Sequence, residues 1–327
     1  MAKKGDHALA LRCLGFALAH PGTYFTNTGV PSGVPNEEAY GFYLRAMEAD
    51  PGNAHVLLEV DELAQKLKMP AEKRLAYLEA RRSVVEKYDP VLLRLAGLYN
   101  ETRQFDKALA ILTSRTFHVW EGGRSLLSYF TDATLGCGLE ARARGDNKGA
   151  AAFFRRALEY PENLQCAPGA SAGVAPQANI FLAECCEAQG DAPGARAALK
   201  AACAGWNLPG EMNFYRAEAL VRLAKAEGRA PDAAAVKAEL TALDGEIARL
   251  EKPFPKELHA SRKFFAGTSQ KEAERANRCQ AKYLRGLKAF HAGKLDEAAK
   301  LFDEAVAGRP SLLWAAYWRT RCVQRAL

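Results

Sequence analysis

One short segment of this sequence holds the residue types best suited to chemistry. Residues 117–123 read Phe-His-Val-Trp-Glu-Gly-Gly, so two aromatic rings, an imidazole and a carboxylate lie within five positions. An indole stacks on the apolar face of a sugar ring, and an imidazole and a carboxylate can hydrogen-bond its hydroxyls. The segment therefore predicts a site for a polar, ring-shaped ligand at Phe117, His118, Trp120 and Glu121.

The same segment has a second interpretation, in which it only packs. Trp120 and Phe117 would then fill a gap between two helical elements, while Gly122 and Gly123 turn the chain. Long connections between helices need such anchors, which favours packing. The ligand interpretation stays open beside it.

A second polar segment follows at residues 161–164, Pro-Glu-Asn-Leu, and leads into residues 167–175, which are rich in small side chains. We interpret this stretch as an insertion tolerated at the surface, with a flexible lid as the alternative. If it lies beside Trp120 in space, the two loops would line a pocket that includes Asn163.

Signatures of catalysis are missing from the sequence. There is no H-E-x-x-H, G-x-S-x-G, G-x-x-x-x-G-K-[ST] or G-x-G-x-x-G, and of the six scattered histidines only His118 has a carboxylate close by in sequence. The eight cysteines include no C-x-x-C, and their spacing offers no four converging zinc ligands. We therefore predict a protein that is not an enzyme, with no catalytic residue, metal or cofactor.

The elements that must position these residues repeat along the chain. Their clearest copy has the pattern Gly286-x2-Ala289, Gly293, Ala298-x3-Phe302, Ala305, Pro310. Small residues at Gly286 and Ala298 predict two antiparallel helices that cross closely, with Phe302 filling the gap to the next hairpin. The pattern resembles the tetratricopeptide repeat, and this resemblance implies an all-α module that binds other molecules.

Further copies are marked by the alanine that begins each second helix. These alanines are Ala108, Ala150, Ala195, Ala233 and Ala298. Their separations of 42, 45, 38 and 65 residues exceed the ideal of about 34, so loops are inserted. Upstream, Gly15 and Ala39 mark one hairpin, and a helix pair broken at Met69-Pro70 forms another.

The copies together predict an all-α, right-handed superhelix of about seven hairpins in one domain, residues 1–327. Its expected parts are a first helix (1–19), an inserted loop (20–35), repeats (36–251), a connecting loop (252–270), the last repeat (271–310) and a C-terminal helix (311–327). The C-terminal helix, with Trp314, Tyr317 and Trp318, is expected to cover the last hairpin.

The concave face of such an array comes from the first helix of each hairpin. The expected contact residues on it are Asn100, Arg142, Glu184, Tyr215, Arg222 and Tyr283. Further lining positions are Glu101, Asp132, Gln177, Glu187, Glu218, Lys225 and His291. This mixed face predicts a scaffold that binds a protein or peptide partner there and through its inserted loops.

Four stretches narrow the resemblance. They are residues 57–75, 117–123, 160–164 and 277–286. In this order they resemble the C-terminal repeat region of a bacterial family that joins a mutarotase-like β-sandwich, a fold associated with sugar binding, to tetratricopeptide repeats. The resemblance covers residues 36–310 and implies, as an alternative, an accessory domain that contacts a glycan or such a sandwich. A glycan-processing enzyme is the third class. No β-sandwich is encoded here, so its sugar chemistry is not transferred.

Composition sets the remaining expectations. The chain is 49% apolar with a net charge of +7 spread along it, which favours a folded protein without a nucleic-acid groove. No stretch approaches the ~20 apolar residues of a membrane span. Lys3-Lys4 and the apolar residues 8–11 mimic a signal peptide, but Arg12 interrupts them. We predict a cytoplasmic location, with an exported form as the alternative.

Overall fold

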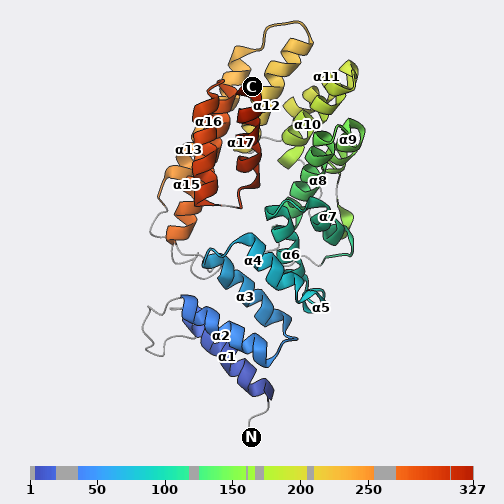
Figure 1. Cartoon of the computed structure of the whole chain (residues 1–327). Helices are drawn as coiled ribbons and strands as arrows, with labels where there is room; N and C mark the ends of the chain where they lie inside the picture. Colours follow the sequence, from blue (N-terminus) through green and yellow to red (C-terminus); the bar gives the residue numbers. More distant parts are fainter. Residues whose placement is uncertain are drawn as a thin grey trace. The chain divides into compact units, whose positions relative to one another are not determined.

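The computed structural model of the chain describes residues 4–19, 36–117, 125–159, 161–165, 173–204, 210–253, 270–309 and 311–326. Within these ranges every regular element is a helix and no strand occurs (Figure 1). The prediction of an all-α fold is confirmed. His118, Trp120 and Glu121 lie outside the described residues, as do the expected inserted loop at 20–35 and most of the connecting loop at 252–270.

Consecutive helices pair into hairpins, as the repeated pattern predicts. The pairs are α1 (Lys4–Ala19) with α2 (Asn36–Ala49), α3 (Ala54–Lys66) with α4 (Ala71–Glu79), α6 (Asp89–Glu101) with α7 (Phe105–Thr113), α8 (Ser125–Ala143) with α9 (Asn147–Arg156), α10 (Ala175–Ala188) with α11 (Ala192–Cys203), α12 (Glu211–Ala226) with α13 (Ala233–Glu251), and α15 (Gln270–His291) with α16 (Leu295–Gly308). The described residues thus contain the seven expected hairpins. They also contain the short α5 (Arg82–Val85), the 3-10 helix η1 (Glu162–Leu164) and a final helix α17 (Leu313–Ala326).

The chain divides into two compact units. Unit 1 comprises residues 1–117 with 264–267 and holds helices α1–α7; unit 2 comprises residues 118–263 with 268–327 and holds α8–α17. Each unit has its own internal packing and is described by itself. The single array over residues 1–327 stays a prediction.

Glycines in the first helices allow the close crossings that the repeat pattern predicts. A Cβ on Gly286 would lie 2.5 Å from the Phe302 ring, and one on Gly138 would lie 2.5 Å from the Phe154 ring. Both rings are fully buried. Phe302 therefore packs inside its own hairpin, against the helix that carries Gly286. The expectation that it also fills the gap to a next hairpin stays a prediction.

Turns between paired helices are stabilised by two recurring devices. Asp146 and Asp191 are N-caps of α9 and α11, and each carboxylate accepts a hydrogen bond from the backbone N–H three residues further on, at 2.8 and 2.9 Å. Such caps stabilise a helix by about 1 kcal/mol each. Gly145 and Gly190 precede them with φ angles of 83° and 74°, a left-handed conformation that favours glycine.

One of the marker alanines does not pack. Ala108, Ala150, Ala195 and Ala298 are buried in their second helices, whereas Ala233 is exposed at the first position of α13. This 19-residue helix buries Leu243, Ile247 and Leu250 instead. Its buried apolar side chains therefore lie in its C-terminal half, while Glu239 in its first half pairs with Arg216 of α12. Helix α13 does begin at Ala233, as predicted, but this alanine does not pack like the other four.

Unit 1 contains a buried ionic cluster. Asp61 of α3 accepts two hydrogen bonds from Arg74 of α4, both at 2.9 Å, and one from Arg94 of α6 at 2.6 Å. Asp61 and Arg74 are only 3% and 6% exposed. Burial alone would raise the pKa of Asp61, but the two guanidiniums more than offset it, and the pKa lies below its ordinary value. The cluster joins three helices of unit 1 through charge-assisted bonds.

Candidate binding face

Helix α17 lies against the first helices of unit 2. Its side chains contact residues of α8, α10, α12 and α15 as well as packing on α16. The contacted residues, called here the α17-binding face, are Asp132, Phe181, Glu184, Phe214, Tyr215 and Phe290. The sequence predicted that α17 covers the last hairpin. In the structure it also occupies a face built by the first helices of four repeats.

The contact residues of α17 recur at helical spacing. Trp314, Tyr317, Trp318 and Arg321 stand at positions i, i+3, i+4 and i+7, so one side of the helix carries all four. The helix also carries three arginines and no carboxylate. It is an amphipathic, basic helix with two indoles on its buried side.

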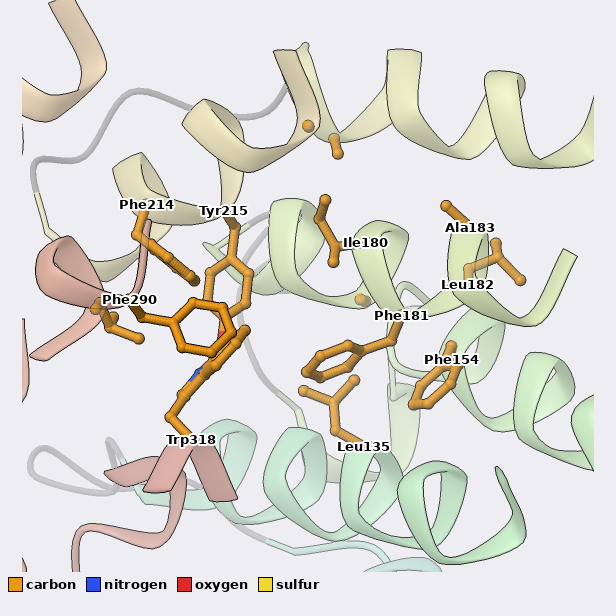
Figure 2. Close-up of a cluster of buried hydrophobic side chains, with 14 of the residues drawn as sticks. Leu135, Phe154, Ile180, Phe181, Leu182, Ala183, Phe214, Tyr215, Phe290 and Trp318 are labelled. Atoms are coloured by element: carbon orange, nitrogen blue, oxygen red, sulfur yellow. The ribbon is translucent and has the colours of Figure 1, made fainter. Parts of the chain in front are cut away.

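Trp318 is the central anchor of this contact. Its ring lies 4.8 Å from that of Phe290, 5.0 Å from that of Phe214 and 5.9 Å from that of Tyr215, measured between centroids (Figure 2). The first two contacts are edge-to-face, the arrangement that aromatic quadrupoles favour. Trp318 is 4% exposed. Its burial fixes the position of α17 on α12 and α15.

Phe181 of α10 forms the second aromatic contact. Its ring lies 6.2 Å from Trp314 and 5.6 Å from Tyr317, and on its other side 5.4 Å from Phe154 of α9. A row of rings thus continues from the core of one hairpin to α17. Phe181 is fully buried by these neighbours.

Both indole N–H groups of α17 have acceptors on the face. Trp314 Nε1 donates to Asp132 Oδ1 at 2.9 Å, and Trp318 Nε1 donates to the Tyr215 hydroxyl at 3.1 Å. A buried donor without a partner costs about 1–3 kcal/mol. The two acceptors therefore suit indole rings, which combine a large apolar surface with one donor.

The Tyr215 hydroxyl belongs to a buried polar network. It accepts a hydrogen bond from Gln177 Nε2 at 2.9 Å and donates to Glu211 Oε1 at 3.4 Å, which also accepts from the Tyr283 hydroxyl at 2.5 Å. Burial raises the pKa of Glu211 to about 7, although the two tyrosine hydroxyls lower it and the nearby charge of Asp132 raises it further. This carboxyl is poised between its two protonation states near neutral pH.

Asp132 is a second carboxyl with an altered pKa. Burial raises the pKa of Asp132 to about 6, against the lowering effect of the hydrogen bond from Trp314. Its position under α17 keeps water from solvating the charge. The α17-binding face thus contains a carboxylate that the indole of Trp314 partly stabilises.

Glu184 of α10 links three helices by charge. It pairs with Arg142 of α8, with Arg222 of α12 at 3.1 Å, and with Arg321 of α17 at 3.2 Å. Arg222 also reaches Glu187 at 2.7 Å. Because the Glu184 side chain is 14% exposed, water screens these pairs only in part. Glu184 thus holds α17 at the opposite end from Trp314.

The predicted concave-face residues of unit 2 do come together. Arg142, Glu184, Tyr215 and Arg222 lie in direct contact with one another or with α17, and Tyr283 joins through Glu211. Tyr215 and Tyr283 are fully buried. They therefore hold α17 and the network in place and present no open surface in this arrangement.

The other predicted contact residues are not members of this cluster. Asn100 belongs to unit 1 and is 4% exposed, and Phe117 is fully buried, so neither side chain offers a face to a ligand. Asn163 is partly buried in η1. The pocket expected between the Trp120 loop and the 161–175 segment depends on residues outside the described ranges.

Sequence reasoning missed the aromatic half of the face. Phe181, Phe214 and Phe290 were not among its predicted residues, nor was Glu211. The signal that would have found them is the spacing Trp314-x2-Tyr317-Trp318-x2-Arg321, which marks a helix with one binding side. Aromatic positions on the first helices are the natural partners for that side.

The described residues contain no group of three or more histidine, cysteine, aspartate or glutamate side chains that is arranged to bind a metal ion. Among the same residues no helix has the length and apolar character to cross a membrane.

Comparisons with known proteins concern the fold. No protein-family model matches the chain. A tetratricopeptide repeat protein from Parabacteroides merdae is similar with a TM-score of 0.44 and 14% identity, over 97% of this chain and 99% of that one. The P58(IPK) TPR domain is similar with a TM-score of 0.33 and 13% identity, over 98% of this chain and 99% of that one. Yeast Tom70 is similar with a TM-score of 0.33 and 15% identity, over 96% of this chain and 64% of that one. Similarities of this size say nothing about partners, and the resemblance to proteins with a mutarotase-like domain stays a prediction.

Proposed function

We propose that this protein is a non-catalytic scaffold that recognises a protein partner on the α17-binding face of unit 2. The observation that carries the proposal is that this face already holds a helix of the chain itself. Aromatic rings, two hydrogen-bond acceptors and one carboxylate grip α17 through side chains alone. A groove that accepts one amphipathic helix in this way has the chemistry to accept another.

The face is rigid before any partner arrives. Arg142 and Arg222 flank Glu184, and Gln177 holds the Tyr215 hydroxyl, all through contacts that do not involve α17. Binding to a preformed surface loses little conformational entropy, which favours affinity. Recognition at this face therefore needs no rearrangement of α8, α10 or α12.

The carboxyls of the face support binding and not turnover. Glu211 accepts hydrogen bonds from two tyrosines, and Asp132 accepts one from an indole. Each is engaged with the protein, and no nucleophile is paired with either among the described contacts. The expected part played by the inter-repeat loops stays within the proposal as a prediction, because the loops at 118–124 and 166–172 lie outside the described residues.

Affinity capture with crosslinking tests the proposal. The full-length chain is immobilised, proteins from the source cells are captured, and crosslinked segments are identified by mass spectrometry. We expect crosslinks to α8, α10 and α12, and weaker capture of the partner with Glu184→Gln, which removes the carboxylate that pairs with Arg321 of α17.

The matched control is Glu246→Gln. Glu246 is also a partly buried glutamate of unit 2, but it pairs with Arg249 of its own helix, α13. This variant should capture as the parent does. Equal capture by both variants, or crosslinks confined to other surfaces, contradicts the proposed function.

A further inference from the structure

We propose that the partner of this face is a basic amphipathic helix with the chemistry of α17, and that it binds by taking the place of α17. Its defining features are two indoles four positions apart and an arginine three positions after the second, as at Trp314, Trp318 and Arg321. The inference rests on the proposed function and names the class of ligand.

Donor and acceptor chemistry selects the indoles. Asp132 Oδ1 and the Tyr215 hydroxyl each accept an N–H from α17, at 2.9 and 3.1 Å. A phenylalanine in either place fills much of the same space but leaves the acceptor buried without that donor, which costs affinity. The face therefore discriminates tryptophan from phenylalanine at two positions.

Charge selects a basic helix. The α17-binding face contributes the carboxylates of Asp132 and Glu184, and Glu211 lies behind it. The sequence of α17 has three arginines and no carboxylate, and Arg321 pairs with this face. Arg321 pairs with Glu184, so an acidic helix in this place would meet like charge at that position.

The architecture allows α17 to leave. Each of the seven hairpins pairs two helices from the rest of the chain, and α17 belongs to none of them. Its grip on α8, α10 and α12 comes from side chains, while its closest backbone packing is with α16. Departure of α17 therefore opens the face without separating any hairpin. A tethered helix competes at an effective concentration on the order of millimolar, which a partner must overcome.

The first measurement uses the unaltered chain. Hydrogen–deuterium exchange followed by mass spectrometry compares the amides of α17 with those of α10 and α12. We expect α17 to exchange faster, through an opening that leaves the hairpins protected. Exchange of all three helices at one common rate means that α17 leaves only on global unfolding, and this overturns the proposal.

The second measurement uses a fluorescein-labelled synthetic peptide with the sequence of residues 311–326. It is titrated into the parent chain and into two full-length variants that weaken α17 differently. Trp314→Ala/Trp318→Ala removes its anchors, and Thr320→Pro breaks the helix near its middle, at an exposed position. We expect at least tenfold tighter binding to both variants than to the parent, because the tethered competitor is lost.

Two controls test whether the peptide binds specifically. A peptide with phenylalanine at both tryptophan positions should bind the variants about tenfold or more weakly, as a lost buried hydrogen bond predicts. Arg319→Ala, on the exposed side of α17 where it meets Asp303, should leave peptide binding like that of the parent. Equal binding of the tryptophan and phenylalanine peptides overturns the proposal. If circular dichroism shows the α17 variants unfolded, the exchange experiment on the parent chain decides.

The crosslinked segment of the captured partner shows which kind of helix binds the α17-binding face. The segment crosslinked to α8, α10 and α12 should be helical and carry the two indoles and a following basic residue. If the parent chain instead forms a dimer in which the two copies exchange α17, the occupant is a second copy of this chain. That result overturns the proposal of a separate partner. If capture of a partner still depends on Glu184 but its segment lacks indoles, the ligand class is wrong while the proposed function stands.

Discussion

At the scale of single residues, the two units place carboxyls in opposite electrostatic situations. In unit 2 burial dominates at Glu211 and Asp132 and raises their pKa values to about 7 and about 6. In unit 1 the guanidiniums dominate at Asp61 and its pKa is lowered. A rise in pH therefore lowers the stability that Glu211 and Asp132 contribute in unit 2, and raises the stability that Asp61 contributes in unit 1.

Unit 2 should lose stability as the pH rises. Between the ordinary carboxyl pKa of about 4 and the raised values, folded unit 2 binds more protons than the unfolded chain, so each increase in pH favours unfolding. We expect a loss of roughly 3–5 kcal/mol between about pH 4.5 and pH 7.5, with contributions from both carboxyls. All four tryptophans belong to unit 2, so urea unfolding followed by indole fluorescence measures it alone.

Glu211→Gln tests the cause of that pH dependence. The amide still accepts a hydrogen bond from a tyrosine hydroxyl but does not ionise, so the variant should show a flatter pH profile than the parent. Glu246→Gln is the control, since its partner Arg249 is exposed. An unchanged slope in Glu211→Gln would show that this carboxyl does not titrate as its burial requires.

In unit 1, Asp61→Asn should cost about 3–5 kcal/mol, because it removes the closest anion of the buried Arg74 and leaves it the carboxylate of Glu101 at 3.9 Å. The parent cluster stabilises the fold above a pH of about 4 and loses this effect as the pH falls through the lowered pKa. Hydrogen exchange in α3, α4 and α6 reports the loss. Arg82→Ala, which removes an exposed pair with Glu86, should change exchange little.

At the scale of helices, the close crossing of paired helices is the feature most exposed to mutation. Gly286→Ala should destabilise unit 2 by about 1–3 kcal/mol, since the new methyl group would overlap the buried Phe302 ring. Chemical unfolding measures the change.

Gly245→Ala provides the matched control for that variant. Gly245 is also a helical glycine of unit 2, but it is exposed on α13 and an added Cβ meets nothing within 4 Å. The substitution should stabilise the helix by up to about 1 kcal/mol through intrinsic propensity. If both alanines stabilise, the crossing of α15 and α16 is looser than the structure has it.

At the scale of the whole molecule, each unit carries its own packing and its own polar cluster. Trp318→Ala should therefore destabilise unit 2 by about 3–5 kcal/mol, through loss of the rings packed around the indole. Exchange in α3, α4 and α6 of unit 1 should stay as in the parent. Loss of protection in those helices as well would show that the two units unfold together.

The sequence by itself determined the helices, their pairing and the positions of close contact. Small residues such as Gly286 and Ala298, and caps such as Asp146, act on neighbours a few residues away or across one short turn, so the pattern carries their structure directly. Helical spacing also placed Arg142, Glu184 and Tyr215 on one face of the array. These are local consequences of a repeat with a fixed period.

Only the tertiary structure decided what lies on that face. Trp314 of α17 meets Asp132 of α8 across 182 positions of sequence, and no local pattern specifies a contact of that separation. Burial raises the pKa of Asp132 against the lowering effect of that hydrogen bond, and Trp318 of the same helix packs on the buried Tyr215. Burial depends on every neighbour at once. Periodicity identifies the side of a helix that packs, whereas the partner of that side is selected by the three-dimensional fit of the whole unit.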